Sequence, residues 1–232
     1  KGGPGKSTIA TNLAVEFARQ GKDVVLVDAD RQRSSARWHE DREELDRTPT
    51  LACVEKLGSI HQTLLDLDGR YDVVLVDVAG HDSKEMRTGM TAADKLVVVV
   101  RPSQFDLDTL PHMSEVIEQA LDLNPSLDVR GLITQAPTNS NASERADAGE
   151  YLSDYPVIKP LRTVIHERKA YRDVIGEGLG VVEWSNTKAK AEIQVLAGDE
   201  ERTYVKNMLD ARKRAAVQRA SRGGKDSKRG GR

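Results

Sequence analysis

The stretch KGGPGKST, residues 1–8, decides the fold. Three of its residues let the backbone curl so that successive N–H groups point inward at phosphate oxygens; they are Gly2, Gly3 and Gly5. The residues that follow, 7–20, carry apolar side chains at every fourth position and stop at Gly21, a pattern that predicts an amphipathic helix. The stretch therefore predicts a phosphate-binding loop that opens a helix.

Three residues at the end of this loop carry the chemistry expected of it. Lys6 is expected to reach the β- and γ-phosphates of a nucleotide, and the hydroxyl of Ser7 to ligate Mg²⁺. Thr8 completes the group predicted to bind the nucleotide. A glycine-rich turn alone is weak evidence, but Gly-Lys-Ser-Thr at the start of an amphipathic helix predicts ATP and Mg²⁺ as ligands.

Short β-branched runs alternate with helix-like stretches along the rest of the chain. The runs lack the period-2 alternation of half-exposed strands, so they predict strands covered on both faces; they span residues 23–30, 72–78, 95–101 and 129–135. Helices are expected between them, at 34–45, 59–67 and 110–121. This order predicts an α/β fold, a mostly parallel twisted sheet with helices on both faces, and ligands at the carboxyl ends of its strands.

Aspartates close two of the Val-rich runs, Asp28 and Asp30 at the end of the first and Asp77 in the second. Any one of them alone would most simply cap a neighbouring loop. Three together, beside a phosphate-binding loop, favour a role at the nucleotide.

The spacing of the two lysines in the opening stretch departs from the ordinary phosphate-binding loop. Lys1 stands five residues before Lys6, where the ordinary pattern relies on a leading glycine. KGG-x-GK-[ST] resembles the deviant Walker A motif of the ParA/MinD group of ATPases. In that family the first lysine reaches across a dimer to the partner's nucleotide, so the resemblance implies a catalytic, nucleotide-contacting role for Lys1.

Further segments extend the resemblance over about residues 1–198, and it is nearest to the short plasmid-type ParA proteins. VDADRQ (27–32) is similar to the family's second motif, which implies that Asp30 positions or activates the attacking water and that Asp28 lies near the metal shell. VVLVDVAG (73–80) resembles the Walker B strand, which implies that Asp77 holds Mg²⁺ through a water. Arg31 replaces the usual proline, a departure within the second motif.

The resemblance also divides the chain. It predicts an ATPase domain over residues 1–198, a C-terminal basic helix over 199–220 and a disordered, Gly-rich basic tail over 221–232. In this family a strand of about six to ten residues precedes the first lysine. The sequence is therefore expected to lack the first strand of its sheet.

Composition and charge limit the functional classes. Residues 211–232 hold nine Lys or Arg against one acid, a net charge of +8. Because the whole chain carries −2, the other 210 residues carry −10. The single cysteine, Cys53, excludes a disulfide framework or a cysteine-ligated cluster within one chain and fits a reducing compartment. We expect a cytoplasmic protein, associated with the nucleoid when ATP is bound.

The resemblance implies a slow, partner-stimulated ATP hydrolase. ATP would join two protomers into a homodimer, the dimer would bind DNA non-specifically, and a ParB-like centromere-binding protein would trigger release, so that plasmid or chromosomal DNA is segregated. Alternatives are a ParA-like ATPase of conjugative transfer and a MinD-like ATPase that acts on a membrane or positions another cargo. The segment before the tail offers few bulky apolar residues among its arginines, so no stable membrane attachment is expected.

Overall fold

The computed structural model describes residues 3–103, 107–138 and 150–199. The chain divides into two units, Lys1–Gln194 and Val195–Arg232, and the fold described below is that of the first. Of the second unit only residues 195–199 are described, and they are helical. The expected basic helix, apart from residue 199, and the expected tail lie outside the described residues, so these divisions stay predictions.

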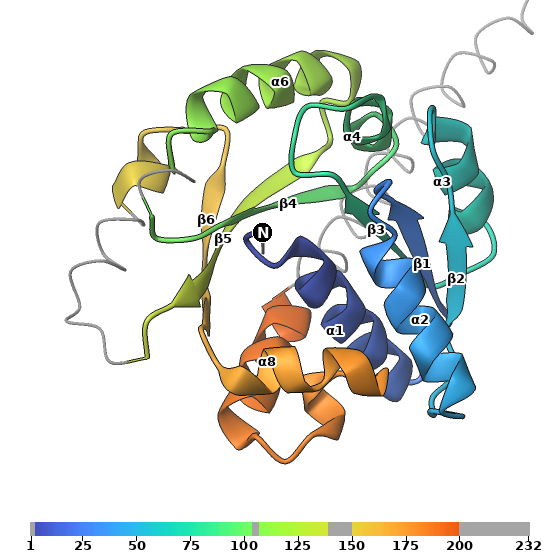
Figure 1. The fold of residues 1–232 in the computed structure, drawn as a ribbon. Coiled ribbons are helices and arrows are strands. Elements are labelled where there is room, and N and C mark those ends of the chain that lie inside the picture. Colours follow the sequence, from blue (N-terminus) through green and yellow to red (C-terminus); the bar gives the residue numbers. More distant parts are fainter. Residues whose placement is uncertain (1–2, 104–106, 139–149, 200–232) are drawn as a thin grey trace, which may run out of the picture. The chain divides into compact units, whose positions relative to one another are not determined.

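Helices and strands alternate along the first unit, as expected (Figure 1). The strands are β1 (Val24–Ala29), β2 (Ala52–Glu55), β3 (Val73–Val78), β4 (Lys95–Val100), β5 (Asp128–Ala136) and β6 (Lys159–His166). The α-helices include α1 (Lys6–Arg19), α2 (Ser34–Glu44), α3 (His61–Asp68), α4 (Lys84–Met90), α6 (Leu110–Leu123) and α8 (Lys169–Asp173). Two short 3₁₀ turns follow α8, η1 (Ile175–Glu177) and η2 (Val181–Glu183).

All strand pairs among the described residues are parallel, and they form two three-stranded groups. The orders are β2-β1-β3 and β4-β5-β6. No backbone ladder joins β3 to β4 within the described residues. The prediction of a mostly parallel sheet is confirmed.

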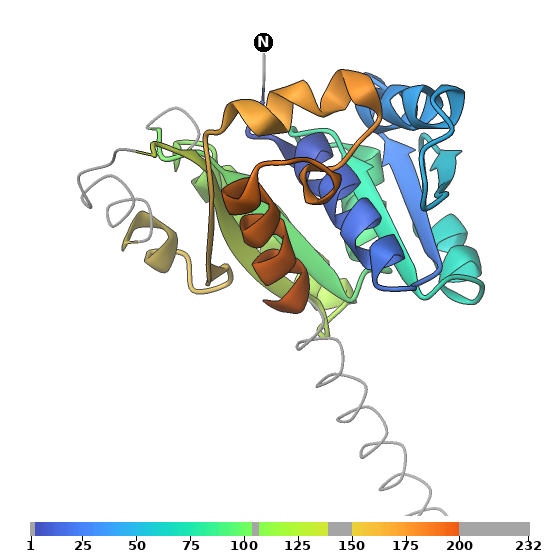
Figure 2. The ribbon, with the colours of Figure 1, turned by 90° about the horizontal axis from the view of Figure 1, so that it is seen from below.

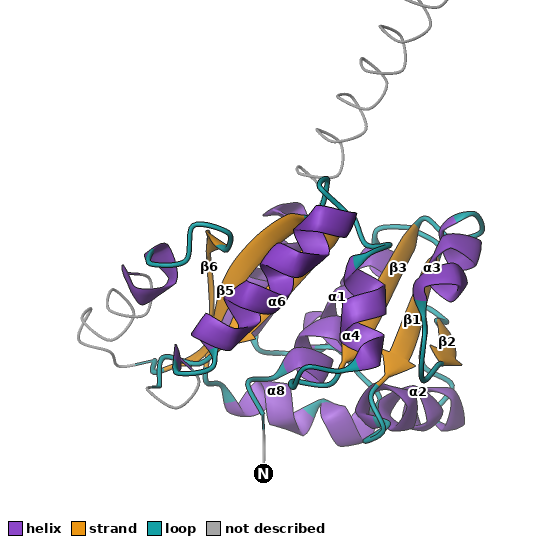
Figure 3. Cartoon of the chain, turned by 90° about the horizontal axis from the view of Figure 1, so that it is seen from above, coloured by secondary structure: helices purple, strands orange, loops and turns teal. Residues whose placement is uncertain are grey.

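Helices cover both faces of these strands. Figures 2 and 3, seen from opposite sides, place α1 and α8 on one face and α4 and α6 on the other. The β4-β5-β6 group buries its main core against α6, around Leu110, Ile117 and Leu152. Leu64 of α3 and Ile60, the N-cap of that helix, pack on the β2-β1-β3 group.

Burial of the strands follows their place in each group. β1, paired on both sides, is buried at every residue, as its apolar run predicted. β3 and β4 have the same Val-rich character but lie at one edge of their groups, and most of their residues are only half-buried. The expectation of strands covered on both faces therefore holds fully for β1 alone among these three.

The first helix forms where the opening stretch predicted it. Gly5 has φ 90°, a left-handed conformation that glycine adopts without strain, and α1 begins at the next residue. Ile9, Leu13 and Phe17 are buried along one side of the helix. Gly21, at φ 83°, ends it one residue after the C-cap.

Candidate nucleotide site

The loop before α1 presents backbone N–H groups at the start of the helix. No side chain of the described residues caps this end of α1, and its first turn holds no acidic residue. The unpaired N–H groups of a helix start attract anions, and the helix dipole adds to the attraction. Gly3, Gly5, Lys6, Ser7 and Thr8 therefore lie where the sequence predicted a phosphate site, whereas Lys1 and Gly2 lie outside the described residues.

Two side chains at the carboxyl end of β5 hold this loop. The hydroxyl of Thr134 donates to the carbonyl of Pro4 at 2.6 Å, and the amide of Gln135 donates to the carbonyl of Gly3 at 3.0 Å. Gln135 itself has φ 52°, which is uncommon for a residue other than glycine. The loop is thus anchored to the β4-β5-β6 group independently of the aspartates.

Lys6 extends from the helix start toward the loop after β3. A Cβ atom placed on Gly80 would lie 2.8 Å from Nζ of Lys6, so a larger residue there would displace the end of the lysine side chain. Burial raises the pKa of the nearby Asp77, and the positive charge of Lys6 offsets part of that rise. The lysine, the glycine and the aspartate thus surround the same point.

Asp28 and Asp77 are neighbours across β1 and β3. They are paired in register, and each is 2% exposed. Burial raises the pKa of Asp77, and the negative charge of Asp28 acts in the same direction. The hydroxyls of Ser7 and Ser35 oppose this rise, the latter through a hydrogen bond to Oδ2 at 2.7 Å.

The second oxygen of Asp77 is the feature that fits a cation. Oδ1 is buried and has no partner of acceptable hydrogen-bond geometry among the described residues. Mg²⁺ in nucleotide sites takes one or two protein oxygens and completes its shell with waters and substrate phosphates. Ser7 and Asp77 provide such a partial set, which is consistent with the absence of any cluster of three His, Cys, Asp or Glu in the described ranges.

Asp28 caps the segments that follow its strand, the simpler role that the sequence analysis weighed for a single aspartate. Its Oδ1 accepts the N–H of Asp30 at 3.0 Å, and its Oδ2 accepts the N–H of Ala36 at 2.8 Å. The carboxylate therefore holds both the loop after β1 and the start of α2. Its role in the metal shell stays a prediction.

Asp30 lies in that loop, where its Oδ1 accepts the N–H of Gln32 at 3.0 Å. Its side chain borders a pocket of about 260 Å³ between the loops that follow β1 and β3. The pocket is lined by Ala29, Asp30, Arg31, Gln32, Ala79, Gly80, His81, Ser83 and Glu85. The pocket opens at the carboxyl ends of two parallel strands, where ligands of such sheets bind.

Three residues that the sequence analysis missed support the site: Ser35, Thr134 and Gln135. Ser35 follows the second motif closely and is fully buried, but a serine inside a polar helix start carries no distinctive pattern. Thr134 and Gln135 end a strand that was predicted, and polar residues at the carboxyl end of a parallel strand were the signal available.

Basic residues near α8 are paired with acids. Arg168 donates to Glu192 and is largely buried, Lys169 pairs with Asp173, and Arg172 pairs with Glu167. These basic side chains therefore take part in intramolecular ion pairs, and those of Lys169 and Arg172 stay exposed. Within the described residues, no helix is both long enough and apolar enough to cross a membrane.

Comparisons with known proteins agree with this geometry. Residues 1–181 match the family described as "CobQ/CobB/MinD/ParA nucleotide binding domain". Maintenance of carboxysome distribution protein A from Halothiobacillus neapolitanus is 31% identical over 189 residues, covering 78% of this chain and 82% of that protein. Protein ParA from Rhizobium radiobacter is 32% identical over 125 residues, covering 53% and 56%.

A solved structure shares the fold. The septum site-determining protein MinD complexed with Mg-ADP, from Pyrococcus horikoshii, superposes with a TM-score of 0.64 at 19% identity, covering 88% of this chain and 93% of that one. The phosphate loop, the paired aspartates and the family match together lead to one conclusion: the chain belongs to the CobQ/CobB/MinD/ParA family of nucleotide-binding domains.

Proposed function

We propose that the chain is a Mg²⁺-dependent ATP hydrolase of the ParA type, which dimerises on ATP and binds DNA without reading its sequence. The observation that carries the enzymatic part is the buried, unpartnered Oδ1 of Asp77 beside Ser7 and Lys6. An orphaned carboxylate oxygen costs stability unless a cation completes it, so its presence favours a metal-nucleotide site.

Each residue then has a definite task. The loop N–H groups and Lys6 bind the β- and γ-phosphates, and Ser7 and Asp77 hold the metal shell on the side of β3. Bound Mg²⁺ would neutralise charge that builds up on the phosphates. Asp30, at the edge of the pocket, orients the attacking water, so an Asp30→Ala variant is expected to bind ATP but to hydrolyse it slowly.

The dimer and its partners extend this proposal. Lys1 would act across the dimer interface, and the basic residues of 211–232 would contact DNA phosphates. A ParB-like protein would stimulate hydrolysis and release. A second candidate is positioning of a cargo other than DNA, which the named function of the Halothiobacillus relative in carboxysome distribution favours.

The deciding experiment measures binding of the protein to duplex DNA and to anionic liposomes at physiological salt, with and without Mg-ATP. We expect DNA binding that requires Mg-ATP and weak liposome binding that does not. Lys6→Ala is the control, because it removes the charge that balances the β- and γ-phosphates and should abolish the ATP effect. ATP-dependent liposome binding without DNA binding would contradict the proposal in favour of a membrane-acting ATPase.

A further inference from the structure

Residues 177–183, here called the brace, connect the two helices that frame the nucleotide site. On the α1 side, the N–H of Val181 donates to Oδ1 of Asn12 at 2.7 Å. Nη1 of Arg19 donates to the carbonyl of Val182 at 3.0 Å, and Gly180 packs against Val15. The brace is therefore bound along the helix that begins with the phosphate loop.

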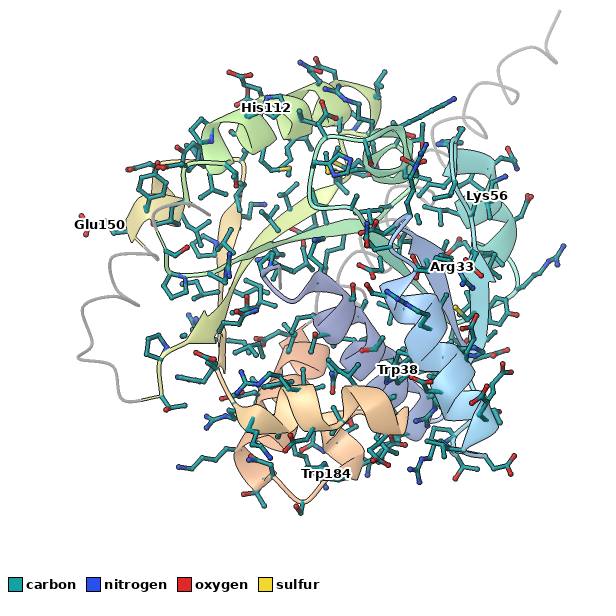
Figure 4. The ribbon with its side chains drawn as sticks, in the orientation of Figure 1. Arg33, Trp38, Lys56, His112, Glu150 and Trp184 are labelled. Atoms are coloured by element: carbon teal, nitrogen blue, oxygen red, sulfur yellow. The ribbon has the colours of Figure 1, made fainter. Side chains whose placement is uncertain are left out.

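The same segment is bound more tightly to α2. Arg42, 1% exposed, donates to the carbonyl of Gly178 at 2.8 Å and to both carboxylate oxygens of Glu183 at 2.9 and 3.0 Å. Its guanidinium lies 5.7 Å from the ring of Trp38, whose Nε1 donates to the carbonyl of Leu179 at 3.2 Å. Figure 4 shows Trp38 between α2 and the segment after α8.

A charge this deeply buried is sustained only when its donors are satisfied. Arg42 meets that condition, because Nε and Nη2 also donate to the carbonyl of Pro49. Glu183 uses one of its oxygens as well to accept the N–H of Gly180 at 2.9 Å, which fixes the brace itself. Arg42 thus locks the last turn of α2 in one position.

The first turn of α2 holds both aspartates of the site. Ser35 donates its hydroxyl to Asp77, and Ala36 donates its N–H to Asp28. A helix of 11 residues is stiff, so a shift of its last turn moves its first turn. The phosphate loop has its own anchor at Thr134 and Gln135 and does not depend on this contact.

We infer that Arg42 is a positioning residue for the metal-binding carboxylates, acting through the brace and α2. The inference rests on the proposed hydrolysis of Mg-ATP. Loosening Arg42 should leave the phosphate loop able to bind nucleotide, while Asp77 and Asp28 lose their fixed placement. Nucleotide binding and Mg²⁺-dependent turnover should therefore respond differently.

The test compares Arg42→Lys, which keeps the charge but loses the fork of donors, with the wild-type chain and with Arg47→Lys. Arg47 is the matched control because it too donates to the brace, at Glu177, but it lies beyond the end of α2. For Arg42→Lys we expect nucleotide affinity without Mg²⁺ within about twofold of wild type. We expect kcat about 10- to 100-fold lower and a higher Mg²⁺ requirement, as when support of a metal ligand is lost. Arg47→Lys should resemble wild type.

Two further variants test the proposed connection between the two ends of α2. Ser35→Ala should reproduce the Mg²⁺ defect, because it removes the last link to Asp77. In a Trp184→Phe background Trp38 is the only tryptophan, and its emission should change on addition of Mg-ATP. Adding Arg42→Lys to this background should abolish that change.

The outcomes separate this inference from the proposed function. If wild type hydrolyses no ATP, the proposed function fails. If wild type does hydrolyse ATP, either of two results for folded Arg42→Lys shows that the positioning role is wrong. One is that the variant keeps the wild-type kcat and Mg²⁺ requirement, and the other is that its nucleotide affinity without Mg²⁺ falls by the same factor as its kcat. Should Arg42→Lys fail to fold, Glu183→Gln decides by the same readouts, because its one amide oxygen can still accept the N–H of Gly180 while Arg42 loses the charge and one of its two acceptors.

Discussion

Asp77 is a carboxylate held in a strand of valines, and its position is costly in the absence of a cation. Burial raises its pKa, so in the folded chain it binds a proton more tightly than in the unfolded chain. At pH values above the folded-state pKa, the Asp77 carboxyl is ionised, and its buried charge therefore lowers the free energy of unfolding. This penalty disappears as the pH falls through that pKa toward the value of an unfolded aspartate.

The substitution Asp77→Asn should accordingly raise the melting temperature of the nucleotide-free chain at pH 7. Each kcal/mol recovered corresponds to about 2–4 °C for a chain of this size. The gain should shrink as the pH is lowered, because the wild-type carboxyl is then protonated as well. Thermal unfolding followed by circular dichroism across pH 4–8 measures it, with the exposed Asp122→Asn as control. A gain that is equal at all pH values would show that the charge is not its source.

Candidate site residues could be named from the sequence where a motif ties chemistry to spacing. Gly3, Gly5, Lys6, Ser7 and the aspartates each stand at a fixed distance from a helix start or a strand end, and their roles at the nucleotide stay predictions. Ser35 and Arg42 could not be named, since their partners Asp77 and Glu183 lie 42 and 141 residues away. Only the tertiary fold brings such pairs together.

At the scale of elements, the four Val-rich or Ile-containing runs were predicted within about two residues because each is long and β-branched. β2 was missed because it has four residues, none fully buried, and β6 because proline, lysine and arginine interrupt its apolar pattern. The edge positions of β3 and β4 could not be predicted either. Strand order depends on pairing, which the local pattern does not encode.

The brace permits a prediction about its own packing. Gly178 has φ 60°, and a Cβ there would lie 2.5 Å from the Cα of Arg42. Gly178→Ala should therefore destabilise the chain by about 1–3 kcal/mol, the usual cost of forced overpacking. Gly176→Ala is the matched control, because nothing lies within 4 Å of its added Cβ. Denaturant unfolding of both variants tests this, and equal stabilities would contradict the close packing of α2 and the brace.

At the scale of the whole molecule, charge is unevenly distributed along the sequence. Nine basic residues in 211–232 stand against an acidic remainder. The attraction of basic residues to phosphates depends on salt, because each phosphate neutralised releases counterions from duplex DNA. Such binding needs no base contacts.

Removal of residues 211–232 should weaken ATP-dependent binding to duplex DNA and flatten its salt dependence. Each lost phosphate contact lowers the slope of log K against log salt by about 0.9. Fluorescence anisotropy over a salt series gives the slope for the full chain and for the truncated chain. ATP hydrolysis in the absence of DNA serves as the control, since the truncation leaves the described site intact. An unchanged slope would assign DNA binding to other residues.

The anchoring of the phosphate loop has a consequence for what a bound nucleotide does to the stability of the fold. The loop is tied to β5 through Thr134 and Gln135, whereas Asp77 belongs to β3. A nucleotide that contacts the loop and, through its metal, Asp77 would hold together segments that are far apart in the sequence. A ligand that binds only the folded chain raises the free energy of unfolding. Each round of hydrolysis would then remove part of that stabilisation as well as alter the ligand.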